Sequence, residues 1–104
     1  MPVLDDFLPT DKSVSVGTSV VEISPETGNL KRKVFFIVNT STGGQIISIA
    51  FGKDAVSGSG IVLSAGNGWA ESVDAIFQPR NLKITAVSSA AGGTVAFHEQ
   101  LWRG

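Results

Sequence analysis

The sequence predicts an all-β protein, a single-domain antiparallel β-sandwich of about eight strands, jelly-roll-like, with an extended N-terminal arm. Short runs rich in β-branched and aromatic residues recur along the chain. Gly, Pro, Asn and Ser separate them at intervals near the roughly 8–12 residues typical of sandwiches and barrels. Almost no segment has a helical period, and 104 residues are sufficient for one hydrophobic core. We therefore expect one domain.

The first twelve residues show neither a helical nor a strand period and carry two of the four prolines. We assign residues 1–12 to the arm and 13–104 to the sandwich. The apolar side chains of the arm are Val3, Leu4, Phe7 and Leu8. One interpretation of the arm is a frayed tail, because chain termini are often frayed. The alternative is an extended segment whose apolar side chains dock on a neighbouring subunit.

The strands are expected where apolar or β-branched residues alternate between turn signals. Alternation places Ile47, Ile49 and Phe51 on one face of their strand, since successive side chains in a strand point to opposite sides. Each connection at 25–29, 41–44, 57–59, 65–67 and 91–93 contains a glycine, which favours a turn. The expected strands are 13–16, 18–24, 31–40, 45–52, 60–63, 68–74, 82–88 and 94–102.

The third expected strand is apolar on both faces over Val34–Val38, which indicates that its second face is also covered. The arm, a long loop or another subunit are candidate covers. Three basic residues, Lys31, Arg32 and Lys33, precede this run directly. We interpret them as solvent-facing charges that oppose edge-to-edge aggregation, because a nucleic-acid patch would need nearby aromatic platforms or more positive charge.

Composition excludes several classes of function. Eight Lys and Arg against nine Asp and Glu give a net charge of −1, whereas general nucleic-acid binding needs a basic excess, so nucleic acid is not an expected partner. The absence of cysteine removes disulfides and thiolate metal sites. No apolar run is long enough to span a bilayer, and the acidic N-terminus does not resemble a signal peptide.

No catalytic, cofactor-binding or metal-binding residues are predicted. His98 is the single histidine, and its neighbour Glu99 must point to the opposite face of the strand, so the two cannot form an orienting pair. The sequence around Ser59 lacks a nucleophile motif. A hydrolase would need a serine and a carboxylate to converge on the His98 ring. We therefore expect a protein that is not an enzyme.

The two tryptophans are candidates for contacts with other molecules. Trp69 follows a glycine-rich turn, where it either covers one end of the sandwich or, if exposed beside Asn67, Asp74 or Gln78, stacks on a sugar. Trp102 and Arg103 lie at the C-terminus, and Trp and Arg are enriched at the energetic centres of interfaces. Core packing is the alternative for each indole.

From Arg32 to Trp69 the order of features resembles a small β-domain found in virion proteins of double-stranded DNA viruses of bacteria and archaea. A basic residue opens an apolar strand that ends in Asn-x-Ser, here Arg32 to Ser41. A strand ending in Phe51-Gly52 follows, then Gly-Ile-x-Leu at 60–63, then a small-Gly turn and an aromatic residue. Residues 84–96 are similar to the last hairpin of such proteins.

This resemblance covers about two-thirds of the chain and carries no catalytic residues. It implies a structural component of the virion, such as a capsid decoration, vertex (penton), minor capsid or fibre module. The expected partners are other copies of the chain, as a trimer or pentamer, and other capsid or virion proteins. The predicted interface residues are Val3, Leu4, Phe7, Leu8, Trp102 and Arg103, with Trp69 as the ligand-stacking candidate. A carbohydrate- or host-receptor-binding module of a fibre or spike is the alternative function.

Overall fold

The computed structural model describes residues 7–27, 31–72 and 81–102. Within these ranges the chain forms strands and connections only, and no helix there could cross a membrane. The strands are β1 (Phe7–Val16), β2 (Val21–Ser24), β3 (Lys31–Asn39), β4 (Ile47–Phe51), β5 (Ile61–Leu63), β6 (Gly68–Ser72), β7 (Ile84–Ser88) and β8 (Gly93–Trp102).

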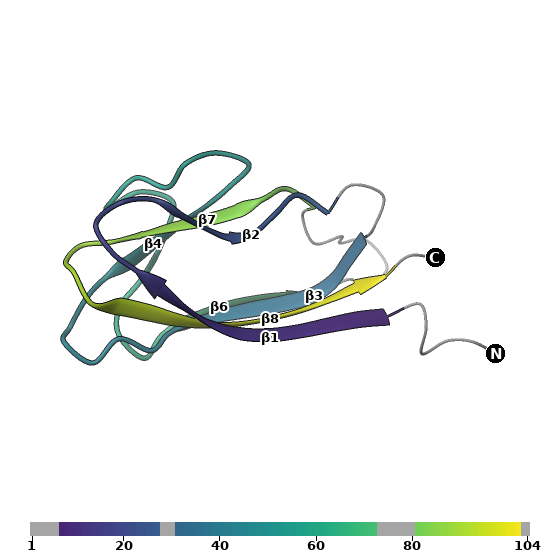
Figure 1. The fold of residues 1–104 in the computed structure, drawn as a ribbon, viewed down its shortest axis with the longest axis horizontal. Coiled ribbons are helices and arrows are strands. Elements are labelled where there is room, and N and C mark those ends of the chain that lie inside the picture. Colours follow the sequence, from purple (N-terminus) through teal and green to yellow (C-terminus); the bar gives the residue numbers. More distant parts are fainter. Residues whose placement is uncertain (1–6, 28–30, 73–80, 103–104) are drawn as a thin grey trace.

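The strands form two four-stranded sheets that face each other (Figure 1). Sheet A has the order β1-β8-β3-β6 and sheet B the order β2-β7-β4-β5. The chain behaves as one long hairpin folded into a sandwich, because β1 pairs with β8, β2 with β7, β3 with β6 and β4 with β5, all antiparallel. This arrangement is the jelly roll, which confirms the predicted fold class.

The strands lie close to the expected positions, with one clear difference at the N-terminus. β1 begins at Phe7, six residues before the expected start at Ser13, and pairs along its whole length with β8. Residues 7–12 therefore belong to sheet A and not to an arm. The pairing register places Phe7 opposite Trp102 and Val16 opposite Gly93. An edge strand has one solvated side, so it accommodates Pro9, Asp11 and Lys12, whose residue types conceal a strand in the sequence.

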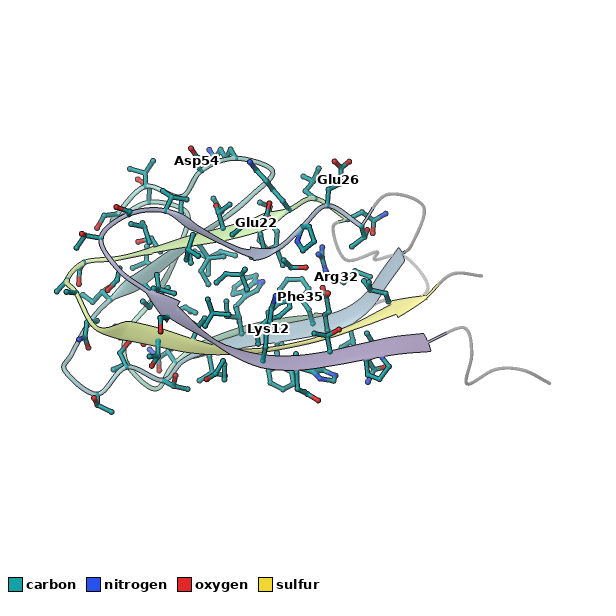
Figure 2. All side chains as sticks on the ribbon, in the orientation of Figure 1. Lys12, Glu22, Glu26, Arg32, Phe35 and Asp54 are labelled. Carbon is teal, nitrogen blue, oxygen red and sulfur yellow. The ribbon has the colours of Figure 1, made fainter. Side chains whose placement is uncertain are left out.

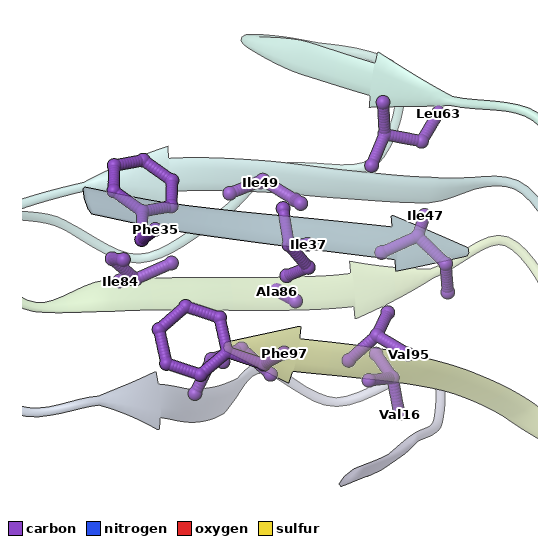
Figure 3. Packing of buried hydrophobic residues seen from close by; sticks show 11 residues of the cluster. Val16, Phe35, Ile37, Ile47, Ile49, Leu63, Ile84, Ala86, Val95 and Phe97 are labelled. Atoms are coloured by element: carbon purple, nitrogen blue, oxygen red, sulfur yellow. The ribbon is translucent and has the colours of Figure 1, made fainter. Parts of the chain in front are cut away.

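The core lies between the sheets and includes Ile47 and Ile49, which alternation had placed on one face of their strand (Figure 3). Phe35 is fully buried, with its ring centroid 5.7 Å from that of Phe51 and 6.3 Å from that of Phe97. Such tilted aromatic pairs contribute more than their buried area alone. The buried cluster comprises Val16, Ile23, Phe35, Ile37, Ile47, Ile49, Leu63, Ile84, Ala86, Val95 and Phe97.

The strands that are buried on both faces are β7 and, from Ile47 to Ala50, β4, and not β3 as expected. All five residues of β7 are buried, because the segment after β4 folds over the outer face of sheet B. Ala55 of this segment packs with Ala50 and Val87. In β3, by contrast, Phe36 stays 43% exposed on the outer face of sheet A.

Candidate functional site

A β-bulge turns Arg32 into the interior of the sandwich. In the pairing of β3 with β8, Arg32 lies opposite Leu101 and Val34 opposite Gln100, so that Lys33 is an extra residue. Without this bulge Arg32 would share the outward face of Val34, two residues along the strand. With it, Arg32 is 0% exposed. The expectation that Arg32 is a solvent-facing charge is therefore wrong.

A second bulge turns Ser24 inward. In β2, Glu22 lies opposite Thr85 and Ser24 opposite Ile84, which makes Ile23 the extra residue. Ile23 belongs to the core between the sheets and Ser24 contacts Arg32 and Glu99 there, although consecutive residues of a regular strand point to opposite faces. The two bulges together direct Ser24 and Arg32 towards the same point between the sheets.

Ser24, Arg32 and Glu99 form a buried polar cluster. Figure 2 shows Arg32 between the two sheets, at the end of the sandwich where β3 begins. The Arg32 Nε donates to Glu99 Oε1 at 3.0 Å, and the Arg32 Nη2 donates to Ser24 Oγ at 3.1 Å. The Ser24 hydroxyl donates to the same Glu99 oxygen at 3.0 Å. The ion pair is thus completed by hydrogen bonds, as a buried charge requires.

Arg32 also ties this end of sheet A to the segment that leads into β7. Its Nη1 donates to the Leu82 carbonyl at 3.2 Å, and its backbone N–H donates to Asn81 Oδ1 at 3.2 Å. Its guanidinium carbon lies 5.7 Å from the Phe35 ring centroid, within cation–π range. The cluster therefore connects the two sheets, and its charges are engaged by protein groups.

Asn39 organises the opposite end of β3. Its side chain is 0% exposed, and its Nδ2 donates at 2.8 Å to each of the Gln45 and Leu63 carbonyls. Its Oδ1 accepts from the Ser41 N–H at 3.0 Å. The Ser41 hydroxyl in turn accepts from the Thr94 N–H at 3.0 Å. The Asn-x-Ser pattern is therefore a structural device that joins the ends of β3, β5 and β8.

His98 lies on the outer face of sheet A, opposite in direction to Glu99, as alternation predicts. Its Nδ1 lies 2.6 Å from Asp11 Oδ1, and its Nε2 lies 3.2 Å from Gln100 Nε2. Its ring stacks on Phe36 with centroids 5.3 Å apart. A carboxylate does converge on this histidine, but its ring nitrogens contact Asp11 and Gln100 and no serine among the described residues.

A surface cavity of about 340 Å³ lies over sheet B, lined by Glu22, Glu26, Gly52, Leu82 and Lys83. Its carboxylates and ammonium belong to exposed or half-buried side chains. Among residues 7–27, 31–72 and 81–102, no group of three or more His, Asp or Glu side chains is placed to hold a metal ion.

The predicted interface residues gather at one end of sheet A as far as the structure describes them. Phe7 and Leu8 begin β1, and Trp102 ends β8, opposite both Phe7 and Lys31. Their backbones are described but not their side chains, while Val3, Leu4 and Arg103 lie outside the described ranges. Their contacts with other subunits stay a prediction.

Trp69 lies in β6, opposite Ile37, and its side chain is 42% exposed. Asn67, in the turn before it, is also exposed. Asp74 and Gln78, the other residues predicted beside a sugar, lie outside the described ranges. The exposure of the Trp69 indole is therefore the observation in the structure that bears on the ligand-stacking prediction.

The strand order defines a jelly-roll domain. The polar side chains of its two buried clusters, around Arg32 and Asn39, are hydrogen-bonded within the protein. No family model and no curated protein matches the sequence. Among solved structures, a subunit of the Bacillus endospore appendages, a family of disulfide-linked pili, has a TM-score of 0.61 at 15% identity over 93% of this chain and 88% of that chain. A chain of the capsid of Helicobacter pylori bacteriophage KHP30 has a TM-score of 0.56 at 9% identity over 93% and 87%. These similarities concern the fold.

Proposed function

We propose that this chain is a structural protein of a virion, a capsid decoration, vertex (penton) or minor capsid component that acts through contacts with its own copies and with capsid proteins. The observation that carries the proposal is the jelly-roll strand order of this chain together with its similarity in fold to a phage capsid chain, which covers 93% of this chain and 87% of that chain. A pilus subunit with a similar fold supports the broader role of an assembly subunit.

The chemistry of the chain is consistent with assembly by non-covalent contacts. The disulfide link of that pilus family is not available here, because the sequence contains no cysteine. The proposed role also needs no catalytic residue. The low net charge of −1 allows copies to approach with little mutual repulsion.

We expect the purified chain to self-associate and to occur at a fixed copy number in particles purified from its source. The first measurement is the solution mass across a concentration series, and the second is quantitative mass spectrometry of the particles. Deleting residues 2–6, which leaves β1 intact, is expected to reduce incorporation if Val3 and Leu4 contact a neighbouring subunit. A chain that stays monomeric and is absent from particles would contradict the proposal.

A second candidate function, carbohydrate or host-receptor binding, is favoured by the exposure of Trp69. If a sugar stacks on this indole, Trp69→Ala is expected to abolish binding on a glycan array, since an aromatic platform supplies much of such affinity. Val62→Ala is the matched control, because Val62 is similarly exposed at 46% and lies in β5, the preceding strand in the sequence, which belongs to sheet B. Equal binding by both variants would exclude Trp69 as the platform.

A further inference from the structure

The long edge of sheet A is the surface on which the inference rests. The edge strands are β1 and β6 in sheet A and β2 and β5 in sheet B. β1 has ten residues, whereas β6, β2 and β5 have five, four and three. Short edges are protected against pairing with other strands, and β2 is further interrupted by its bulge. β1 is the exception.

The hydrogen bonds of β8 show which groups of β1 point away from the sheet. The N–H of Thr94 donates to Ser41 and its C=O accepts from Thr40, so both backbone groups of Thr94 face β3. Thr94 lies opposite Ser15, which therefore belongs to a pair without mutual hydrogen bonds. By alternation, the N–H and C=O groups of Asp11, Ser13 and Ser15 all point outward.

Both ends of this outward row are defined. At one end Pro9 has no N–H, which fits a position facing away from β8. At the other end the carbonyl of Gly17 points outward and accepts from the Ser88 N–H at 2.8 Å, so the chain itself uses that position. No described residue is hydrogen-bonded to the outward backbone groups between them. The side chains of Asp11, Ser13 and Ser15 are exposed.

The row is complementary to itself in one antiparallel register. When Ser13 pairs with Ser13 of a second copy, Asp11 lies opposite Ser15 in both directions, and every outward donor meets an acceptor. On the inner face the same register places Lys12 opposite Val14. If the centre of the pairing moves one residue towards the N-terminus, Lys12 lies opposite Lys12 of the second copy. If it moves two residues, Asp11 lies opposite Asp11. Both registers are disfavoured, because like charges directly opposite each other are destabilising. Moving it towards the C-terminus brings in the occupied Gly17 carbonyl.

We propose that β1 is a self-association edge, on which a second copy of this chain adds its own β1 antiparallel about Ser13 and extends sheet A into one continuous sheet. The proposal deepens the proposed function, and it rests on that function only for the existence of self-association. Antiparallel pairing about Ser13 is two-fold, and it therefore adds a two-fold contact to the trimer or pentamer expected from the sequence.

Backbone variants at Ser13 test the pairing. Ser13→Pro removes an N–H that faces away from β8, so the fold is expected to persist while the association is lost. Ser13→Ala keeps that N–H and is the matched control, expected to associate as the unmodified chain does. The measurements are solution mass by sedimentation and the unfolding midpoint of each variant.

Single cysteines test the register, and they stay informative if Ser13→Pro fails to fold. Residues paired across the two-fold axis have Cα atoms about 5.5 Å apart, which a disulfide can bridge. The two copies of residue 15 would be offset by four residues along the strands, so their Cα atoms would lie at least about 13 Å apart. Under mild oxidation Ser13→Cys is thus expected to cross-link at least about tenfold faster than Ser15→Cys.

The outcomes separate the two proposals. Loss of association in Ser13→Pro, its retention in Ser13→Ala and preferential cross-linking at residue 13 support the β1 edge. Association that is unaffected by Ser13→Pro, or equal cross-linking at residues 13 and 15, overturns the β1 edge and leaves the structural role standing. A chain that is monomeric at every concentration contradicts both.

Discussion

Replacing Arg32 with alanine is expected to lower the free energy of unfolding by about 3–5 kcal/mol, because it leaves Glu99 buried without its charged partner. Glu99 is 6% exposed, and Ser24 would be the remaining donor to its carboxylate in the cluster. The variant also loses the hydrogen bond from the guanidinium to the Leu82 carbonyl. It keeps the bond to Asn81 Oδ1, because the backbone N–H of residue 32 donates it. Chemical denaturation monitored by tryptophan fluorescence measures the change.

Two further variants separate the buried charge from charge in general. Lys83→Ala removes an exposed ion pair, with Lys83 Nζ and Asp54 Oδ1 4.0 Å apart, and is expected to cost at most about 1 kcal/mol. The double variant Arg32→Met, Glu99→Leu removes both buried charges and is expected to be more stable than Arg32→Ala alone. A loss for Arg32→Ala as small as that for Lys83→Ala would show that the ion pair does not stabilise the sandwich.

Replacing Asn39 with alanine is expected to destabilise the fold by about 3 kcal/mol, at roughly 1 kcal/mol for each of the three hydrogen bonds that its side chain makes. The carbonyl of Leu63 and the N–H of Ser41 would be left buried without this partner. Asn67→Ala is the control, because that side chain is exposed in a turn. Urea denaturation at neutral pH compares the two, and equal midpoints would contradict the role assigned to Asn39.

Asn39→Asp gives the same site a pH dependence of known sign. An aspartate carboxylate would face the Gln45 and Leu63 carbonyls, which accept and cannot donate, so its pKa in the folded state is raised. A carboxyl with a raised folded-state pKa stabilises the fold below its unfolded-state pKa and loses that contribution as the pH rises. Stability of Asn39→Asp relative to the unmodified chain is therefore expected to increase from pH 7 towards pH 4.

Local signals in the sequence were sufficient for most of the strands and for part of the core. Alternation assigned Ile47, Ile49 and Phe51 to one face; Ile47 and Ile49 are buried in the cluster between the sheets, and Phe51 packs against it. Side-chain direction in a regular strand depends only on neighbouring residues, which is why this part could be predicted. The same alternation placed His98 and Glu99 on opposite faces.

The buried polar cluster could not be predicted, because it depends on two bulges. Each bulge exists only in the pairing of two strands, β3 with β8 and β2 with β7, and nothing in the residues around Lys33 or Ile23 marks an extra residue. The basic run at 31–33 therefore looked uniformly solvent-facing. The start of β1 was hidden for a related reason, since residues 7–12 are strand because β8 pairs with them.

What the sequence by itself determined is an all-β chain of one domain, with turns at its glycines, apolar faces set by alternation and a composition that lacks cysteine. The order of the strands, the inward direction of Ser24 and Arg32 and the outward hydrogen-bonding edge of β1 were decided only in the tertiary structure. The physical reason is that turns and alternation are local, whereas register, bulges and edges are properties of two strands that lie far apart in the chain.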